Sequence, residues 1–321
     1  MASQHRRVKV KIPSSSANLA SGFDILAVAH DAFHDEVEIN ISGEGYTKIK
    51  LTIEGSYSDK IPSNIESNVV TIPILKLLNT LNEKLNLEIR VRKEIPPGKG
   101  LGSSGASSIG GVIALNKLLG DVLTYKELLN IAVEGEKAVA GSPHYDNIAA
   151  SLLGGFVLVD VDKDGFLVDA YKLSNGSSFR FLLIVPHIEV SEYKTMYSRK
   201  IIPNRVSLSD HIRNSVYLAL LIYGITTDNP EVAGKGFNDN IVEPARASLI
   251  PLYSRVKDKA LEMGAYGVAI SGAGPSIIIL ANSDIIDELG RTINKIYSSE
   301  GYNVSIIKAK PCSGAIETAT L

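Results

Sequence analysis

The chain has 321 residues, of which 45% are hydrophobic and 21% are charged, which suggests two globular domains or one large one with a sizeable core. A formal net charge of -2 argues against a general nucleic-acid-binding or membrane-surface protein. The single cysteine, Cys312, excludes an intrachain disulfide and a metal cluster built from thiolates.

The first half of the chain is predicted to mix strands with helices. Apolar and polar residues alternate over residues 8–12, 37–41, 49–53 and 87–95, which is typical of half-buried strands. Helical spacing covers residues 68–81, 103–119 and 124–140, and Thr124 and Glu127 have the spacing of a capping box. Between the first two strands, residues 13–18 are predicted to form a turn that continues as a loop to Gly22.

In the second half, residues 154–161 and 166–173 are predicted to form two strands joined by a tight turn at 163–165. This turn is the best candidate for a boundary between a domain of residues 1–165 and a domain of residues 166–321. Further strands are predicted at 181–186, 267–271, 276–281 and 304–308, and helices at 207–223, 251–263 and 284–299. Because strands and helices do not alternate strictly, we expect an α+β fold rather than a doubly wound parallel sheet.

The segment of residues 95–108 is the most informative in the chain. It holds four glycines, four serines and one lysine between a predicted strand and a predicted helix. Glycine allows a tight turn and a close approach to a ligand, and the unpaired N–H groups of a helix start favour phosphate. Ser104 offers a hydroxyl for a metal ion or a phosphate oxygen, and Lys99 offers a mobile cation. The segment therefore predicts a loop that binds a nucleoside triphosphate.

Three other interpretations of this segment stand beside that prediction. A P-loop needs Ser or Thr directly after Gly-Lys, whereas Gly100 follows the Gly-Lys pair at 98–99. The spacing G-x-G-x-x-G at 100–105 fits a dinucleotide fingerprint, but the expected acid is represented only by Asp121, in a predicted helix-ending turn. A merely flexible loop conflicts with the apolar segments on both sides.

Two further candidate sites consist of polar residues, one at 18–24 and one at 134–147. Asn18 and Asp24 could together hold an ammonium or a hydroxyl group, or could simply cap a local turn. Glu136 lies late in a predicted helix, and its carboxylate suits Mg²⁺ held with ATP phosphates; the alternative is a solvated helix face where it pairs with Lys137. His144, Asp146 and Asn147 precede an apolar run at 148–153, which predicts a buried helix start.

Two arginines and a second glycine-rich turn complete the candidate residues. Arg199 and Arg246 are each a suitable partner for a carboxylate because the guanidinium fork matches two oxygens, although each taken alone is more typical of a surface arginine. Residues 271–276, Ser-Gly-Ala-Gly-Pro-Ser, lie between two predicted strands. They could form a hairpin turn or bring backbone close to the loop at 95–108.

Taken together, these segments resemble the GHMP kinases. Residues 13–24, 96–104 and 272–276 are similar to that family's three motifs and occur in the same order. Within the family, the set resembles the homoserine kinases, through residues 16–24, His144-x-Asp146-Asn147, Arg199-x-x-Ile202-Pro203 and Asp239-x-x-x-Glu243-Pro244-x-Arg246. Ala20, Ser21 and Tyr145 depart from the pattern, where the family has Gly, Pro and Pro.

The resemblance implies a fold and a role for each candidate residue. The fold would have an N-terminal domain of ribosomal-protein-S5-like topology and a ferredoxin-like C-terminal domain, with the active site between them. The residues expected to bind ATP are Asn68, Pro97, Gly98, Lys99, Gly100, Leu101, Gly102, Ser103, Ser104, Gly105 and Ala106. Ser104 and Glu136 would hold Mg²⁺, and Lys99 and Thr195 would neutralise the γ-phosphate. Asn18, His144, Arg199 and Arg246 would grip an amino acid, while Asp24 and Asn147 would orient its hydroxyl.

The resemblance therefore implies transfer of the γ-phosphoryl group of ATP to the side-chain hydroxyl of L-homoserine, in threonine biosynthesis. Another small alcohol, such as shikimate or mevalonate, and a ligand-binding regulator without catalysis are the alternatives. Either Asp24 or Asp146 could serve as a base. The resemblance also implies a possible homodimer. No apolar run is long enough to span a bilayer and residues 1–11 lack the apolar core of a signal peptide, so we expect a cytoplasmic protein without membrane or nucleic-acid partners.

Overall fold

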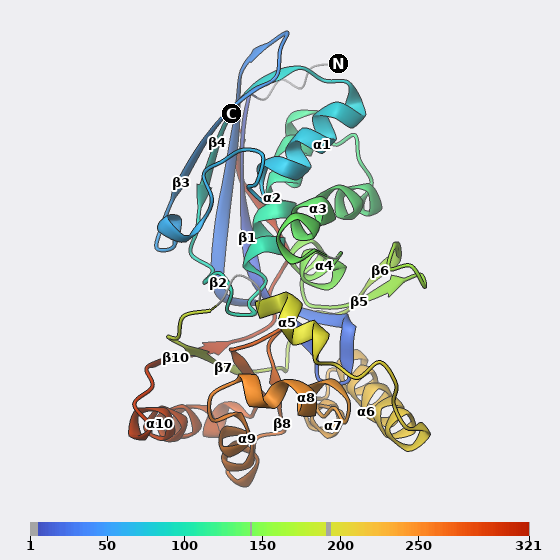
Figure 1. Ribbon diagram of the computed structural model, residues 1–321, viewed down its shortest axis with the longest axis vertical. Helices are drawn as coiled ribbons and strands as arrows, with labels where there is room; N and C mark the ends of the chain where they lie inside the picture. Colours follow the sequence, from blue (N-terminus) through green and yellow to red (C-terminus); the bar gives the residue numbers. More distant parts are fainter. Residues whose placement is uncertain (1–5, 142, 191–193, 321) are drawn as a thin grey trace.

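Two sheets organise the chain in the computed structural model, which describes residues 6–141, 143–190 and 194–320. The first sheet has seven strands, with β11, β1, β2, β4 and β3 side by side, β5 pairing with β2 and β6 with β5. Its strands are β1 (Arg7–Leu19), β2 (Gly22–Glu44), β3 (Lys48–Glu54), β4 (Leu85–Arg92), β5 (Phe156–Val161), β6 (Leu167–Ser174) and β11 (Ile316–Thr320). Figure 1 shows this sheet in the upper half of the molecule.

The hairpin of β1 and β2 differs from the sequence prediction. Residues 13–18 are strand rather than turn, and the predicted loop up to Gly22 is only a two-residue turn at 20–21, because β1 pairs with β2 as far as Leu19 opposite Gly22. Ser14, Ser15 and Ser16 are fully buried in this strand, and their hydroxyls bind partners inside the protein. The prediction was wrong because these polar residues, typical of turns, are paired within the interior.

Helices cover one face of the first sheet (Figure 1). They are α1 (Thr71–Leu81), α2 (Ser103–Leu118), α3 (Tyr125–Ala140) and α4 (Tyr145–Leu153). Nearly all of α2 is buried, because its Gly, Ala and Ser residues let it pack between β1, α1, α3 and α4. The predicted capping box is confirmed: the Thr124 hydroxyl accepts a hydrogen bond from Glu127 N–H, and the Glu127 carboxylate accepts one from Thr124 N–H. The helix start predicted around Asp146 and residues 148–153 is also confirmed, as α4.

The second sheet lies below the first in Figure 1 and has the order β10-β7-β9-β8. Its strands are β7 (Phe181–Pro186), β8 (Gly267–Ile270), β9 (Ile277–Leu280) and β10 (Val304–Ala309), all predicted from the sequence. The helices of this half are α5 (Lys194–Lys200), α6 (Leu208–Thr226), α7 (Pro230–Lys235), α8 (Val242–Arg246), α9 (Tyr253–Glu262) and α10 (Ser283–Ser299). The short helices α5, α7 and α8 were not predicted, since five to seven residues carry too little periodicity.

The chain enters the second sheet later than the predicted boundary at residue 165. That position lies in the turn between β5 and β6, and both strands belong to the first sheet. The second sheet begins with β7, and β11 returns to pair with β1. The observed architecture is α+β, as predicted.

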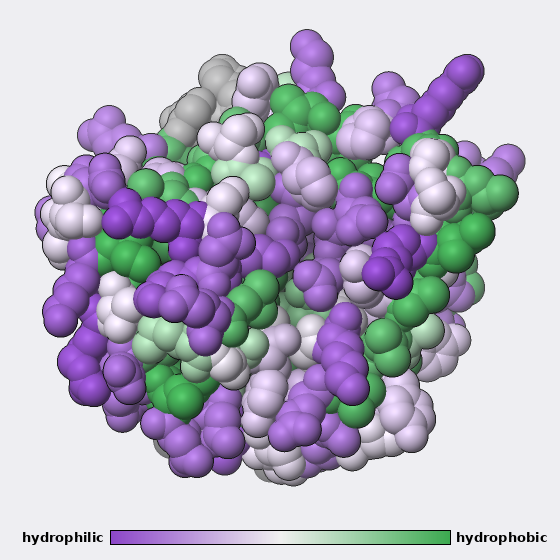
Figure 2. All heavy atoms as spheres, turned by 90° about the horizontal axis from the view of Figure 1, so that it is seen from below, coloured by the Kyte–Doolittle hydropathy of each residue, from purple (hydrophilic) through white to green (hydrophobic). Residues whose placement is uncertain are grey.

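Seen from below, the face formed by the second half is mostly hydrophilic, with hydrophobic residues gathered on the side of α6 (Figure 2). Helix α6 exposes Leu208, Ile212, Val216 and Tyr223. Its buried residues, Leu221 and Ile225, face the protein, so α6 is packed along one side only. Within the described ranges, the model contains no helix with the length and hydropathy needed to cross a membrane.

Candidate active site

A cavity of about 1500 Å³ is lined by both halves of the fold. It receives residues from the loop between β4 and α2, from the β1–β2 hairpin, from the start of α4, and from α5, α8, β7 and β10. Almost every predicted site residue lines this cavity. The exceptions are Gly105 and Ala106, which are buried in the first turn of α2, and Thr195, whose side chain lies outside the described part of the structure.

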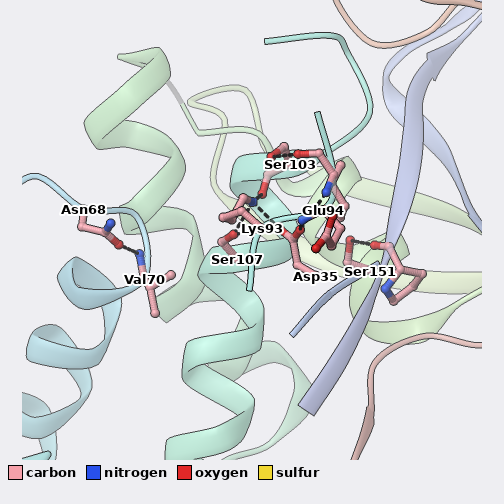
Figure 3. A network of polar contacts seen from close by, with 10 residues as sticks. Asp35, Asn68, Val70, Lys93, Glu94, Ser103, Ser107 and Ser151 are labelled. Atoms are coloured by element: carbon pink, nitrogen blue, oxygen red, sulfur yellow. Dashed lines mark hydrogen bonds and ion pairs between the residues drawn. The ribbon is translucent and has the colours of Figure 1, made fainter. Parts of the chain in front are cut away.

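Both ends of the loop between β4 and α2 are attached to one buried carboxylate (Figure 3). Asp35 of β2 accepts hydrogen bonds from the backbone N–H groups of residues 94–95, at 2.8 and 2.9 Å, where the loop begins. Asp35 also pairs with Lys93, whose ammonium donates to the carbonyl of Ser103 at 3.0 Å and to the hydroxyl of Ser107 at 2.6 Å, where α2 begins. This ion pair therefore fixes the entry and the exit of the loop together.

The loop carbonyls point into the protein. Three successive carbonyl groups accept hydrogen bonds from β1 and from the connection between β8 and β9. The bonds are Ser276 N–H to Lys99 O at 3.3 Å, Ser271 Oγ–H to Gly100 O at 2.6 Å, and Ser15 N–H to Leu101 O at 3.1 Å. Because C=O and N–H point in opposite directions in a trans peptide, the N–H groups of residues 100–102 point away from these donors.

These three N–H groups are available to bind an anion. Within the described part of the chain, none of them has a hydrogen-bond acceptor, and all three residues line the cavity. The N-terminus of α2 follows directly and adds its own unpaired N–H groups and the positive end of its dipole. Consecutive N–H groups beside a helix start are a favourable site for phosphate. This geometry is compatible with the triphosphate loop that the sequence predicts.

Gly100 is a position in this loop where the backbone of another segment leaves no room for a side chain. Its φ is +77°, and a Cβ there would lie 2.1 Å from the carbonyl oxygen of Ser271. Gly98 has a similar φ of +71°, but a Cβ there would lie 3.6 Å from the side chain of Val190. A substituted side chain would therefore strain the backbone at both positions, but only at Gly100 would it also lack space.

We expect Gly100→Ala to lower the free energy of unfolding by about 3 kcal/mol and Gly98→Ala by only about 1 kcal/mol. The difference arises because only the first substitution forces the loop away from Ser271. Denaturant titration measures both values, and isothermal titration with Mg-ATP should show weaker binding for Gly100→Ala alone. Equal losses in the two variants would contradict the loop geometry described here.

Glu136 provides a buried carboxylate beside the helix start. Its side chain belongs to α3, and its Oε1 has no hydrogen-bond partner among the described residues. Burial raises the pKa of the Glu136 carboxyl, while a hydrogen bond from Ser104 and the charge of Lys93 oppose that rise. A buried carboxylate oxygen without a partner is costly unless a cation binds it.

The residues present fit a magnesium–nucleotide complex. Mg²⁺ prefers oxygen ligands and is commonly held by one or two protein groups together with substrate phosphates. Ser104 and Glu136 supply a hydroxyl and a carboxylate next to the three free N–H groups. The described residues contain no group of three or more His, Cys, Asp or Glu side chains arranged to hold a metal. The remaining ligands would therefore have to come from phosphate oxygens and water.

Two residues predicted to bind the nucleotide also hold the protein together. The ammonium of Lys99 donates to the carbonyl of Ile188, and burial together with the charge of Lys60 lowers its pKa. The side chain of Asn68 accepts from Val70 N–H at 2.9 Å, shown in Figure 3. Lys99 and Asn68 therefore face the cavity in positions that the protein itself fixes.

Asp24 and Arg199 form an ion pair in the lining of the cavity. Both terminal nitrogens of Arg199 donate to Oδ2 of Asp24, at 2.8 and 2.7 Å, and Asn18 Oδ1 accepts from Asp24 N–H at 2.9 Å. Burial raises the pKa of Asp24, and the charges of Arg199 and Arg246 counteract this. Arg199 thus has a carboxylate partner within the protein, which leaves Arg246 as the better candidate for a carboxylate of the ligand.

Arg246 is a buried cation with backbone partners. Its guanidinium donates to the carbonyls of Ser198 at 3.0 Å and Gly272 at 3.3 Å, and lies 5.0 Å from the ring centre of Phe23. No carboxylate of the described residues lies within 4.0 Å of it. Burial lowers the pKa of Arg246 to about 10, so it remains charged at neutral pH. A buried arginine without a close counter-ion favours an anionic ligand.

The start of α4 brings three polar residues to the same region. Burial and the two neighbouring arginines lower the pKa of His144 to about 4, so its imidazole is neutral at pH 7. Asn147 accepts a hydrogen bond from the hydroxyl of Ser15 at 2.9 Å, so its amide NH₂ is the group that remains for a ligand. Burial, followed by the charges of Asp24 and Glu136, raises the pKa of Asp146 to about 7.

Asp146 should make the stability of the fold depend on pH. Its pKa in the folded state, about 7, lies above the ordinary value of 3.8, so the folded state binds more protons between pH 4 and pH 7. Its contribution to stability therefore falls as the pH rises through this window. We expect Asp146→Asn to gain up to about 4 kcal/mol of unfolding free energy relative to the wild type between pH 4 and pH 8. Denaturant titrations across this range measure the difference.

The matched control for this measurement is Asp164→Asn, which alters an exposed aspartate in the β5–β6 turn. Its stability should follow that of the wild type at every pH. Parallel curves for Asp146→Asn and the wild type would contradict the buried, proton-binding state of Asp146.

The sequence reasoning missed several residues that build the site. Asp35 and Lys93 lie in ordinary alternating strands, and nothing in their local pattern distinguishes them from surface charges. Phe23, which contacts both arginines, is an apolar residue inside a polar motif. Ser15 and Ser271 form hydrogen bonds with residues distant in the sequence, and periodicity cannot detect such contacts.

Comparison with known proteins agrees with this geometry. Two family models match the chain, the GHMP kinases N terminal domain over residues 68–155 and the GHMP kinases C terminal over residues 225–299. The chain is 39% identical to the homoserine kinase of Thermoplasma volcanium, covering 96% of this chain and 95% of that protein. It is 41% identical to the homoserine kinase of Saccharolobus solfataricus, covering 94% and 95%.

A solved structure shows the same fold over the whole chain. The crystal structure of homoserine kinase from Cytophaga hutchinsonii superposes with a TM-score of 0.88, is 34% identical, and covers 99% of both chains. The chain therefore belongs to the GHMP kinases, with their two-domain α+β fold, and within them to the homoserine kinases.

Proposed function

We propose that this protein transfers the γ-phosphoryl group of ATP to the side-chain hydroxyl of L-homoserine and so forms O-phospho-L-homoserine, a step in threonine biosynthesis. One observation carries the proposal: the lining of a single cavity includes Glu136, the buried cation of Arg246, and three loop N–H groups that have no acceptor among the described residues. The N–H groups and Glu136 suit a triphosphate bound with Mg²⁺, and Arg246 suits the carboxylate of an amino acid. The full-length relatives named homoserine kinase support the same choice of substrate.

The residues proposed to bind the nucleotide would supply charge stabilisation. The N–H groups of residues 100–102 and the first turn of α2 would bind the phosphate oxygens, with Lys99 close by. Ser104 and Glu136 would hold Mg²⁺, which when bound offsets the charge of the transferred phosphoryl group. The role proposed for Thr195 beside the γ-phosphate rests on the family resemblance alone.

Other residues of the cavity would hold the amino acid. Arg246 would bind the carboxylate, and Arg199 would act by fixing Asp24. Asn18 and the neutral His144 would accept hydrogen bonds from the ammonium group. The amide NH₂ of Asn147, whose oxygen already accepts from Ser15, and the carboxylate of Asp24 would orient the hydroxyl.

In the reaction, the hydroxyl oxygen forms a bond to the γ-phosphorus while the bond to the β–γ bridging oxygen breaks. ADP leaves, and the hydroxyl proton is released. Phosphoryl transfer depends mainly on positioning and charge stabilisation, so the proposal assigns no dedicated base. Asp24 is paired with Arg199, and the raised pKa of Asp146 leaves a large share of it protonated at pH 7.

A substrate panel tests this proposal. ADP release is measured with Mg-ATP and L-homoserine, L-threonine, L-serine, shikimate or mevalonate, each over a range of concentrations. We expect kcat/KM to be highest for L-homoserine. Preferred turnover of another alcohol would keep the kinase assignment and overturn the substrate. ATP binding without turnover of any compound would instead support a regulator that binds ligands.

The homodimer and the absence of nucleic-acid and membrane partners stay predictions. A cytoplasmic location is likewise proposed rather than observed. Sedimentation analysis of the purified chain distinguishes a monomer from a dimer.

A further inference from the structure

A buried histidine lies behind the triphosphate loop, outside the cavity. His30 of β2 is 0% exposed and bonds to two serines of the neighbouring strand β1. Its Nδ1 lies 3.0 Å from Ser14 Oγ, and its Nε2 lies 3.1 Å from Ser16 Oγ. Ser16 Oγ lies 2.7 Å from Ser271 Oγ, which donates to the carbonyl of Gly100 at 2.6 Å. A continuous chain of hydrogen bonds thus leads from His30 to the loop.

The order of protons in this chain follows from its last bond. A carbonyl only accepts, so Ser271 must give its proton to Gly100, and Ser16 must give its own to Ser271. Ser16 Oγ can then serve His30 only as an acceptor, which places a proton on Nε2. In the opposite tautomer, with the proton on Nδ1, all these hydrogen bonds would reverse. Ser14 Oγ would then donate to His30 O, at 3.2 Å, and Ser271 would no longer donate to Gly100 O. The shorter bond at Gly100 decides for the Nε2–H form.

The imidazole is neutral in this arrangement. Burial, aided by the charge of His34, lowers the pKa of His30 to about 3. Neutral Nδ1 is then an acceptor, and the Ser14 hydroxyl donates to it while accepting from Phe33 N–H at 3.2 Å. Every hydrogen bond from Phe33 to Gly100 therefore runs in one direction, and each buried polar group of this hydrogen-bond chain has a partner.

The direction of the chain has a consequence for the ligand. Fixing the Gly100 carbonyl toward Ser271 turns the N–H of Leu101 in the opposite direction, where the phosphate site lies. We propose that His30, acting through Ser16 and Ser271, is a positioning residue that holds the Gly100–Leu101 peptide in the orientation that binds the triphosphate. This inference rests on the proposed nucleotide site and assigns a role to a residue that contacts neither substrate.

Two serines of β1 provide a matched pair of variants. Ser16→Ala cuts the chain between His30 and the loop, whereas Ser14→Ala removes the other partner of the same imidazole and leaves the loop arm intact. Both serines are fully buried, so both variants should lose stability. Only Ser16→Ala should raise the Kd of Mg-ATP, on the order of tenfold, while Ser14→Ala should change it less than about twofold. Ser151→Ala, another buried serine of the first half, replaces Ser14→Ala if that variant does not fold.

A second pair of variants tests the tautomer. The amide of glutamine can place a donor near the position of Nε2, whereas asparagine reaches only the position of Nδ1. His30→Gln should therefore keep the Kd of Mg-ATP close to that of the wild type, and His30→Asn should resemble Ser16→Ala. In the wild type, ¹⁵N spectra of histidine-labelled protein should show His30 as the neutral Nε2–H form.

The outcomes separate this inference from the proposed function. If the wild type binds no Mg-ATP, the nucleotide site is wrong and the positioning role falls with it. If the wild type binds Mg-ATP and Ser16→Ala binds it equally well, only the positioning role is overturned. An Nδ1–H tautomer in the wild type would also overturn it. Weaker binding in Ser16→Ala and His30→Asn, with near-normal binding in Ser14→Ala and His30→Gln, would support it.

Discussion

Glu136→Gln is expected to lower kcat for ADP release with L-homoserine by about 10²–10³-fold, the size of effect seen when one group that stabilises transition-state charge is removed. Glutamine keeps the shape of the side chain but not the negative charge that would hold Mg²⁺ beside the phosphates. The concentration of Mg²⁺ needed for half-maximal rate should rise as well. Steady-state rates at a series of Mg²⁺ concentrations measure both changes.

The same substitution should not weaken the fold. Oε1 of Glu136 is buried without a hydrogen-bond partner among the described residues, so removing its charge relieves a cost of burial. We therefore expect the free energy of unfolding to stay equal or to increase while activity falls. Glu134→Gln is the control: Glu134 lies two residues away on α3 and pairs with Lys137 at 2.9 Å at the surface, so its loss should alter neither property much. Full activity in Glu136→Gln would remove this residue from the site.

Arg246→Ala should lower kcat/KM for L-homoserine by roughly 30- to 1000-fold, which corresponds to about 2–4 kcal/mol for a buried charge pair. The guanidinium is buried and, among the residues that the structure describes, donates only to carbonyls, so the substrate carboxylate would be its counter-ion. Arg246→Lys should recover only part of the loss, because lysine keeps the charge but not the two-pronged geometry. Steady-state kinetics with L-homoserine varied at saturating Mg-ATP measure the effect.

Nucleotide binding distinguishes this effect from a general loss of structure. The Kd of Mg-ATP should rise far less than kcat/KM falls in Arg246→Ala, because Asp35 and Lys93 still hold both ends of the phosphate-binding loop when the bond from Arg246 to Gly272 is lost. Arg255→Ala removes an exposed arginine of α9 that pairs with Glu300, and it serves as a control for loss of charge. An unchanged kcat/KM in Arg246→Ala would show that another group binds the carboxylate.

The sequence predicted the parts of the site that are built from local patterns. The loop at 95–108, the helix that follows it and the helix start at Asp146 all carry signals within a few residues, and each occurs in the structure. Glu136 was located by its carboxylate and its position late in a helix. Such features depend on neighbours in the sequence, which is why motif and periodicity could identify them.

The remaining parts depend on contacts between distant residues. Ser16 lies 255 positions from Ser271 and yet shares a hydrogen bond with it, so the serines of β1 looked like turn residues rather than buried strand residues. The pairing of Asp24 with Arg199 joins two predicted ligands to each other across 175 positions. No pattern within either segment could show that Arg199 already has a carboxylate partner within the protein.

The most direct test of the account is to identify the product formed from Mg-ATP and L-homoserine by ³¹P NMR. The proposed function predicts ADP together with a phosphate monoester whose phosphorus couples to the terminal methylene protons of homoserine. Formation of ADP and inorganic phosphate alone, or no reaction while Mg-ATP is bound, would contradict transfer to the homoserine hydroxyl.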